Sequence, residues 1–235
     1  MLKSLKIMQQ YFPALMSALP ATMQLLIISV VIALFLGLLL AWARLSKNRA
    51  ASLISYVIIS FMRGTPMMVQ LLLIFILIPL IAYSNGIDTS SLSPSVYAII
   101  SFSINEACFF AEIFRSAYQS IDSGQMEAAS SLGMGRMQIF RRVILPQGAI
   151  AALPNTSNMI IELMKNTSIA SVIGVYDILG KAAQLGKNNY GRGQLELYIE
   201  AGIMFWILGL IILFISNLIQ ERISRCDRKG GLAHV

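Results

Sequence analysis

The sequence predicts an all-α integral membrane protein with about five membrane-spanning helices. Hydrophobic residues make up 57% of the 235 positions and charged residues 12%, whereas soluble domains carry roughly 25% charged residues. Apolar runs long enough to cross a bilayer, about 20 residues, alternate with short basic segments. A longer polar segment between the third and fourth runs has the pattern of short helices rather than of disorder.

Five runs of mainly apolar residues are predicted to span the membrane: 19–43, 53–83, 93–118, 148–175 and 201–220. The first and the fifth carry no charge. The second is interrupted at residues 63–66, where Pro66 is expected to kink the helix near its cytoplasmic end. The third contains Glu106 and Glu112, and the fourth contains Glu162 and Lys165.

The distribution of Lys and Arg predicts the orientation, because cytoplasmic loops carry an excess of basic residues. Twelve lie in segments on one side of the spans: Arg44, Lys47, Arg49, Arg63, Arg115, Arg136, Arg141, Arg142, Arg222, Arg225, Arg228 and Lys229. Five lie on the other side: Lys3, Lys6, Lys181, Lys187 and Arg192. We therefore expect the N-terminus and residues 1–18 outside, and residues 223–235 as a cytoplasmic tail. The loop at 177–194 is basic although this orientation makes it external.

The composition argues against several other classes of protein. The net charge of +7 could indicate nucleic-acid binding, but the basic residues are spread between the apolar runs rather than gathered on one face. The cysteines are Cys108 and Cys226, and the single histidine is His234. Their spacing predicts neither a disulfide framework nor a metal site. We therefore predict no catalytic residue and no metal ligand.

The polar segment between the third and fourth runs is expected to begin with a short, slim helix. Asp122 and Gln125 have the spacing of a capping box, in which two side chains satisfy two free amides at a helix start. Glu127 is expected in the first turn, where a negative charge is favourable beside the helix dipole. Small residues follow, and Gly133 or Gly135 is expected to end the helix.

A second short helix is expected to follow and to end before Pro146, which fits the first turn of the next helix. Its apolar face is predicted to consist of Met137, Phe140, Val143 and Ile144. Its cations, on another face, are Arg136, Arg141 and Arg142. Such a segment is suited either to insertion into a groove of another protein or to lying on lipid headgroups as an amphipathic loop.

The same segment resembles the EAA loop of ABC importer permeases. Glu127-Ala128-Ala129 is followed, at the family spacing, by Gly133 and then by Val143-Ile144-Leu145-Pro146. The one departure is Val143, which stands where the pattern has isoleucine. Other stretches resemble the polar amino acid uptake branch of that family: Thr22-Met23-Gln24-Leu25, Arg63-Gly64-Thr65-Pro66 with Val69-Gln70, Ala111-Glu112-Ile113-Phe114-Arg115, and Asn166-Thr167-Ser168 with Val172-Ile173-Gly174.

The resemblance covers residues 19–222 and implies the five-helix core of a type I ABC importer transmembrane domain in the bacterial inner membrane. It implies import of a polar amino acid or a related derivative. The implied partners are a second permease subunit (identical or different), a cytoplasmic dimer of ATP-binding-cassette ATPases and an extracytoplasmic amino-acid-binding protein. Residues 123–146, the coupling loop, would contact the ATPase. The residues implied in that contact are Glu127, Ala128, Ala129, Gly133, Arg136, Arg141 and Arg142.

The chain is not expected to be an enzyme or to bind a cofactor. No Gly-x-x-x-x-Gly-Lys-Ser/Thr loop is present in the sequence to hold the phosphates of a nucleotide. ATP would therefore be bound and hydrolysed by the partner ATPase, and the energy would cross a subunit interface.

Seven residues of the third and fourth runs are candidates for the substrate pathway: Asn105, Glu106, Phe109, Glu162, Lys165, Thr167 and Ser168. Ionisable groups at membrane depth usually face a cavity, a partner or a pathway. Glu106 is suited to holding the ammonium group of a substrate, with Asn105 offering amide hydrogen bonds. An equally open interpretation is that Glu106 bonds to a neighbouring helix.

Other residues have structural interpretations. Glu112 and Arg115 are spaced i, i+3 and are predicted to form an ion pair on one helix face. Gly37 and Ala41 form a pair of small residues that predicts close helix packing. Arg63 is expected either to mark the kink at Pro66 or to anchor in lipid headgroups.

The main alternative function is that of a stand-alone, ion-coupled secondary transporter. Five spans without an inverted repeat, together with a patterned cytoplasmic helix, argue against it. A membrane-bound enzyme is a third class, which no cluster of nucleophiles, histidines or carboxylates supports.

Overall fold

The computed structural model describes residues 2–231, with the side chains of residues 7–223. Within these residues every regular element is helical, as predicted. The elements are α1 (Leu2–Met16), α2 (Leu19–Leu45), α3 (Arg49–Gly64), α4 (Met67–Ser84), α5 (Pro94–Gln119), α6 (Ser123–Ser131), α7 (Arg136–Ile139), the π-helix η1 (Phe140–Ile144), α8 (Leu145–Asn166), the 3₁₀-helix η2 (Thr167–Ile173), α9 (Ile178–Asn188) and α10 (Gln194–Gly231). The side chains of Lys3, Lys6, Arg225, Cys226, Arg228, Lys229 and His234 lie outside those described.

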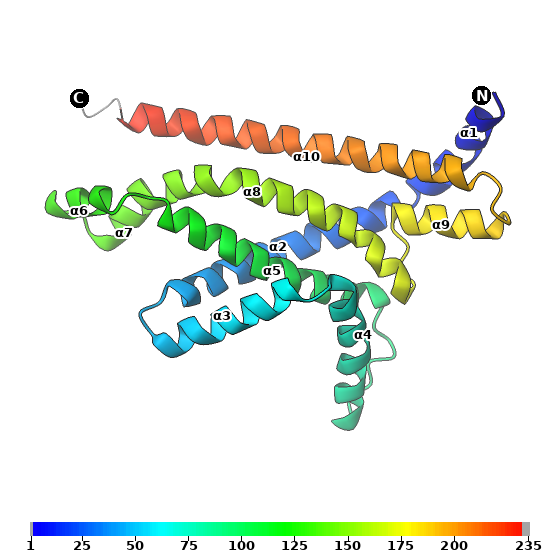
Figure 1. Ribbon diagram of the computed structural model, residues 1–235, viewed down its shortest axis with the longest axis horizontal. Coiled ribbons are helices and arrows are strands. Elements are labelled where there is room, and N and C mark those ends of the chain that lie inside the picture. The colour runs from blue at the N-terminus through cyan, green and yellow to red at the C-terminus, as the bar shows by residue number, and fades with distance from the viewer. Residues whose placement is uncertain (1, 232–235) are drawn as a thin grey trace.

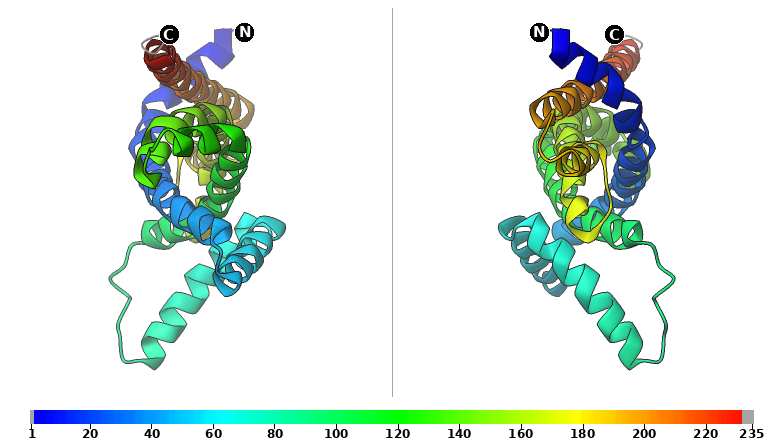
Figure 2. Two further views of the ribbon diagram at one scale, coloured as in Figure 1. Left: turned by 90° about the vertical axis from the view of Figure 1, so that its left-hand side faces the viewer. Right: turned by 90° about the vertical axis from the view of Figure 1, so that its right-hand side faces the viewer.

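The long helices α2, α5, α8 and α10 run along the long axis of the molecule, and α3 folds back beside them (Figure 1). The short helices α6 and α7 lie at one end, and α1 and α9 lie at the other. Seen from either end, α4 and the loop after it project away from this bundle (Figure 2). The two ends therefore carry different polar elements, joined by a long apolar middle.

Four helices of the described part are long and apolar enough to cross a membrane: Leu19–Leu45, Met67–Ser84, Pro94–Gln119 and Gln194–Ile223. The predicted second run is two helices, α3 and α4, which meet at Thr65 and Pro66. Pro66 has an extended backbone and precedes the first residue of α4, so the expected kink is a complete break. The predicted fourth run consists of α8 followed by η2. Because of its polar residues, it is not among the four helices that are apolar enough to cross a membrane.

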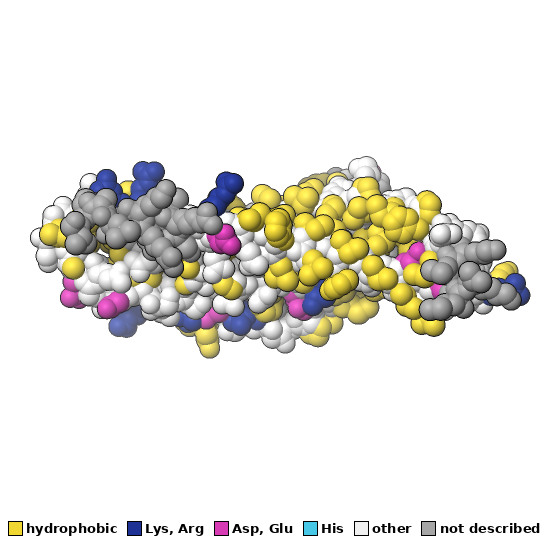
Figure 3. All heavy atoms as spheres, turned by 90° about the horizontal axis from the view of Figure 1, so that it is seen from above, with side chains coloured by type: hydrophobic (Ala, Val, Ile, Leu, Met, Phe, Trp, Pro, Cys, Tyr) yellow, Lys and Arg dark blue, Asp and Glu magenta, His cyan; other side chains and the backbone are white. Residues whose placement is uncertain are grey.

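The apolar middle of the chain faces outward as well as inward. Viewed over α10, hydrophobic side chains cover much of the middle and right of the surface, and Lys, Arg, Asp and Glu lie in the left half, along the lower edge and at the right-hand end (Figure 3). Phe35 on α2 and Trp206 and Phe214 on α10 are each about two-thirds exposed. Exposed apolar patches of this extent are unusual in soluble monomers, so this surface is suited to lipid.

A close helix contact lies between α2 and α5, at Gly37. A Cβ atom at this position would lie 2.8 Å from the Cβ of Phe110 and 3.1 Å from the carbonyl oxygen of Ala107. One turn further along α2, Ala41 is buried together with Cys108 and Ala111. The predicted small-residue face at Gly37 and Ala41 is thus confirmed, because the absence of side-chain volume lets the two backbones approach.

The helices α1 and α9 were not predicted; residues 1–18 were expected to be an external segment and residues 177–194 an external loop. Leu15, Ile178 and Leu197 are fully buried where α1, α9 and α10 meet. The amide of Ile178 donates a hydrogen bond to Oγ1 of Thr22 on α2, at 3.2 Å. Short segments such as these gain their helical structure largely from tertiary packing, which their own sequence does not reveal.

Replacing Gly37 with alanine is expected to destabilise the protein by about 1–3 kcal/mol, because the added methyl group must displace Phe110 or the α5 backbone. Thermal unfolding of the purified protein in detergent would measure this as a lower melting temperature. The matched control is Gly202→Ala on α10, where a Cβ meets no atom within 4 Å. Equal melting temperatures for the two variants would contradict the close contact.

Candidate functional site

The coupling loop begins with α6, a helix that stands away from the bundle. Asp122 caps it by accepting a hydrogen bond from the amide of Gly124, at 2.9 Å. Gly133 ends it with a φ of +79°, a conformation that glycine adopts without steric cost. Glu127 and Ala128 are exposed, and Leu132 is 83% exposed. An exposed leucine and an exposed carboxylate within one short segment are suited to contact with another protein.

Two details of the predicted helix start are wrong. Gln125 does not complete a capping box; its side-chain oxygen accepts a hydrogen bond from Nε2 of Gln147, at 2.7 Å. Because α6 starts at Ser123, its first turn contains no acidic residue and Glu127 falls in the second turn. Asp122 alone caps the helix, which leaves Gln125 available to connect α6 to the beginning of α8.

The rest of the coupling loop is a continuous helical segment in which α7 passes through η1 into α8. Gln138 accepts a hydrogen bond from the amide of Gly135 at 3.0 Å, and Pro146 lies in the first turn of α8, as predicted. The predicted cations and part of the predicted apolar face are exposed: Arg136, Arg141, Arg142, Met137 and Phe140. Val143 and Ile144 are half-buried. Single-turn π-helices occur frequently at functional sites.

A network of amide side chains closes the break between α3 and α4. Nε2 of Gln70 donates to the carbonyl oxygen of Met62 at 2.8 Å and to Oγ1 of Thr65 at 2.7 Å. Nδ2 of Asn105 on α5 donates to Oε1 of Gln70 at 2.9 Å and to the carbonyl of Met62 at 3.3 Å. Asn105 therefore fixes the break, and its contact with substrate stays a prediction.

Glu106 lies beside this network with its carboxylate in the interior. Its side chain is 1% exposed, and Oε2 has no hydrogen-bond partner within the described part of the chain. Glu162 on α8 lies within electrostatic range, but it forms its own ion pair with Lys165 at 3.4 Å, and both of these side chains are more than half exposed. A buried carboxylate without a partner costs several kcal/mol and is suited to a cationic ligand.

One turn along α5, Phe109 faces a pocket of about 230 Å³ that polar and apolar side chains line together. The guanidinium of Arg63 lies 5.3 Å from the centre of the Phe109 ring, so Arg63 reaches the pocket rather than only the lipid surface. Asn155 and Asn158 on α8 line the same pocket. The predicted pair of Glu112 and Arg115 is confirmed, and Glu112 also contributes to the wall.

Thr167 and Ser168 meet at a residue that the sequence interpretation missed. Both hydroxyls donate to Oδ2 of Asp177, at 3.0 Å and 2.6 Å, and Oδ1 of Asp177 accepts the amide of Gly180 at 2.8 Å. Asp177 is fully buried. Its position directly before α9 is a helix-cap signal that would have identified it, had this helix been expected.

The structure thus brings Asn105, Glu106 and Phe109 onto one side of α5, with Glu162 near Glu106. Lys165 pairs with Glu162, and Thr167 and Ser168 belong to the separate Asp177 cluster. The residues that the resemblance implies in the ATPase contact gather at the far end of the bundle (Figure 1): Glu127, Ala128, Ala129, Gly133, Arg136, Arg141 and Arg142. All of them are exposed except Ala129, which is buried and anchors α6.

Comparison with known proteins decides the family. Residues 33–225 match the model of the binding-protein-dependent transport system inner membrane component. The chain belongs to this family. Its relatives among amino-acid ABC permeases include the L-cystine transport system permease protein TcyL of Bacillus subtilis, 37% identical over 92% of this chain and 89% of TcyL. The arginine transport system permease protein ArtQ of Bacillus subtilis is 31% identical over 92% of this chain and 94% of ArtQ.

Solved structures agree with the family assignment. A crystal structure of an amino acid ABC transporter with histidines has a TM-score of 0.78 and 32% identity, over 92% of this chain and 96% of that chain. The inward-facing MetNI methionine ABC transporter has a TM-score of 0.65 at 22% identity, over 93% of this chain and 98% of that chain, and shows the fold alone. The fold of this permease family member is therefore that of type I ABC importer transmembrane domains.

Replacing Asp177 with alanine is expected to destabilise this permease by about 2–4 kcal/mol, because the hydroxyls of Thr167 and Ser168 and the amide of Gly180 lose their acceptor in the interior. Hydrogen exchange measured by mass spectrometry should rise in η2 and the first turn of α9. The control is Asp88→Ala, whose exposed carboxylate accepts a bond from the Ser90 amide. Unchanged exchange in η2 would contradict the structural role of Asp177.

Proposed function

We propose that this chain is the permease subunit of an ABC importer that moves a polar amino acid, or a related derivative, into the cytoplasm. The observation that carries the proposal is the exposed α6 helix within a chain that belongs to the binding-protein-dependent transport family. The relatives that are named for cystine and arginine transport support an amino-acid substrate.

ATP hydrolysis on a separate subunit drives this transport. Glu127 on α6 and Leu132 at its C-cap contact a groove of the ATPase. Arg136, Arg141 and Arg142 extend the contact surface. Since α7, η1 and α8 form one continuous helical segment, a displacement of the coupling loop is transmitted along α8 to Glu162. The ATPase is a dimer, and the complex includes a second permease subunit and an extracytoplasmic amino-acid-binding protein.

The proposed location is the bacterial cytoplasmic membrane, with the N-terminus outside and the C-terminus in the cytoplasm. The coupling loop, the turn between α2 and α3 and the C-terminal end of α10 all lie towards one end of the molecule (Figure 1). The excess of Lys and Arg at that end supports its assignment to the cytoplasm.

Glu106 is the group we assign to the substrate. A buried, unpaired carboxylate can accept an ammonium group that has left water, and the amino acid's own charge then compensates the cost of burying Glu106. Phe109, Arg63 and the two asparagines of the neighbouring pocket offer contacts for the rest of the substrate as it moves towards the cytoplasmic end.

Reversing the charge of the coupling helix tests the energy source. In liposomes that contain the permease, its ATPase and its binding protein, Glu127→Arg is expected to lower ATP-driven uptake by about tenfold or more, because a repelled interfacial charge costs a few kcal/mol. The control Asp88→Arg reverses an exposed charge far from α6 and should transport normally. Ion-gradient-driven uptake that persists without ATPase or ATP would replace the importer with a stand-alone secondary transporter.

Neutralising Glu106 tests the substrate assignment. Glu106→Gln is expected to lower uptake by about tenfold or more, since a charged hydrogen bond is worth about 1.5–3 kcal/mol, while the melting temperature stays equal or rises. The matched control is Glu200→Gln on α10, a second buried glutamate whose Oε2 has no described partner. A lower melting temperature with unchanged uptake per folded protein would show that Glu106 is structural instead.

A further inference from the structure

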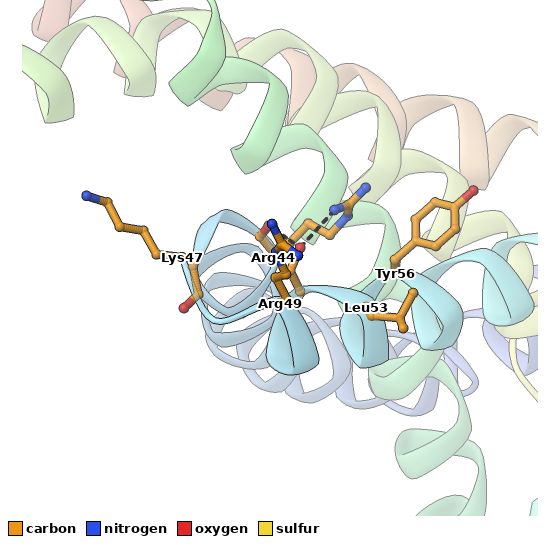
Figure 4. A pocket seen from close by; sticks show the side chains of 7 residues that line it. Arg44, Lys47, Arg49, Leu53 and Tyr56 are labelled. Carbon is orange, nitrogen blue, oxygen red and sulfur yellow. Dashed lines mark hydrogen bonds between the residues drawn. The ribbon is translucent and has the colours of Figure 1, made fainter.

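The turn between α2 and α3 forms a cationic pocket of about 440 Å³ that the transport function does not use. Arg44 at the end of α2 and Lys47 and Arg49 after it contribute the charges, and Ser52 and Tyr56 on α3 form the opposite wall. Figure 4 shows the Arg44 side chain extended over the start of α3, with Arg49 beside it and Lys47 pointing away from the turn.

Arg44 is held in place before any ligand binds. Its Nη1 donates to Oγ of Ser52 at 3.1 Å, and the same hydroxyl donates to the carbonyl oxygen of Arg44 at 3.1 Å. The guanidinium also lies 4.8 Å from the centre of the Tyr56 ring. A guanidinium has five N–H donors, so the fixed side chain keeps donors for an anion and loses little entropy on binding it.

The positive charge of the pocket has no carboxylate paired with it. The ion pairs within the described side chains join Glu112 to Arg115 and Glu162 to Lys165. Glu112 lies within electrostatic range of Arg44, but its oxygens bond to Arg115. The sequence has no Asp or Glu before Asp88. The pocket therefore lacks an internal anion, and phosphate is the group that a fixed arginine binds with both charge and geometry.

The side chains around the pocket suit a lipid as the ligand better than a soluble anion. Leu53 lines the pocket, and the exposed side chains of Ile54, Val57 and Phe61 continue an apolar face along α3. Trp42, 76% exposed at the end of α2, and Tyr56 are the residue types that mark the membrane interface. At the same end of the molecule, α6 extends beyond this turn (Figure 1), which places the pocket nearer the apolar middle than the coupling helix.

We propose that the cationic pocket binds the phosphate of an anionic phospholipid, with one acyl chain lying along the apolar face of α3. Arg44 and Arg49 contact the phosphate, and the Tyr56 ring keeps the Arg44 guanidinium oriented towards it. The lipid thereby fixes the start of α3, the helix whose far end carries the break closed by Gln70 and Asn105. Assignment to the cytoplasmic leaflet rests on the proposed orientation, whereas the binding itself does not.

Native mass spectrometry of the purified full-length permease, titrated with phosphatidylglycerol or with phosphatidylcholine of the same acyl chains, tests the proposal. The wild type is expected to bind one phosphatidylglycerol preferentially. Arg44→Ala/Arg49→Ala should weaken that binding by about 30-fold, the effect of two basic residues near an anionic lipid. The matched control Lys187→Ala/Arg192→Ala removes two exposed cations at the opposite end and should bind as the wild type does.

A charge-neutral variant separates a built pocket from general attraction. Tyr56→Leu keeps every charge but removes the ring that orients Arg44, and it should weaken phosphatidylglycerol binding about three- to tenfold. This variant also decides the result if the double variant fails to fold, as judged by size-exclusion chromatography. Equal binding of the two lipids, an equal loss in the control, or unchanged binding in Tyr56→Leu would overturn the proposal. Displacement of the lipid by inorganic phosphate at equal concentration would show a free-anion site and overturn it as well.

Discussion

The close contact of α2 with α5 at Gly37 is the interaction on which the rest of the structure depends. It fixes the position of α5, and α5 carries Asn105, Glu106 and Phe109 on one side and leads directly into the coupling loop at its end. Association of helices within a membrane gains little from the hydrophobic effect, because lipid is as apolar as the helices themselves. Tight van der Waals packing between small residues therefore has to supply the stability that a soluble protein obtains from burying its core.

A second constraint is that backbone groups inside a bilayer must find partners within the protein. This chain interrupts its helices at the break between α3 and α4 and again at η2. At the break between α3 and α4, Gln70 and Asn105 satisfy the free carbonyl groups. At η2, the hydroxyls of Thr167 and Ser168 bond to Asp177. Both clusters make irregular backbone stable. The polar side chains of the first are committed to the backbone, which leaves the neighbouring Glu106 open to a cationic ligand.

The end of the molecule that we assign to the cytoplasm presents two surfaces of different character. The coupling loop offers an exposed leucine, an exposed carboxylate and three arginines on a slim helix, which suits a protein groove. The cationic pocket at the turn between α2 and α3 lies nearer the apolar middle, beside a continuous apolar face. Their different depths along the long axis allow both to be occupied at once: the first by the ATPase and the second by a lipid of the same leaflet.

The sequence by itself determined the membrane class, the five apolar runs, an interruption of the second run at Pro66 that it gave as a kink, the close packing at Gly37 and the helix of the coupling loop. Each of these depends on local signals: run length, proline and glycine geometry, and an Asp cap. Only the tertiary structure decided that α1 and α9 are helices, that Asn105 fixes a break and that Asp177 holds η2. These depend on partners far apart in the chain, such as Thr22 with Ile178, and no local pattern encodes a contact between segments that the fold alone brings together.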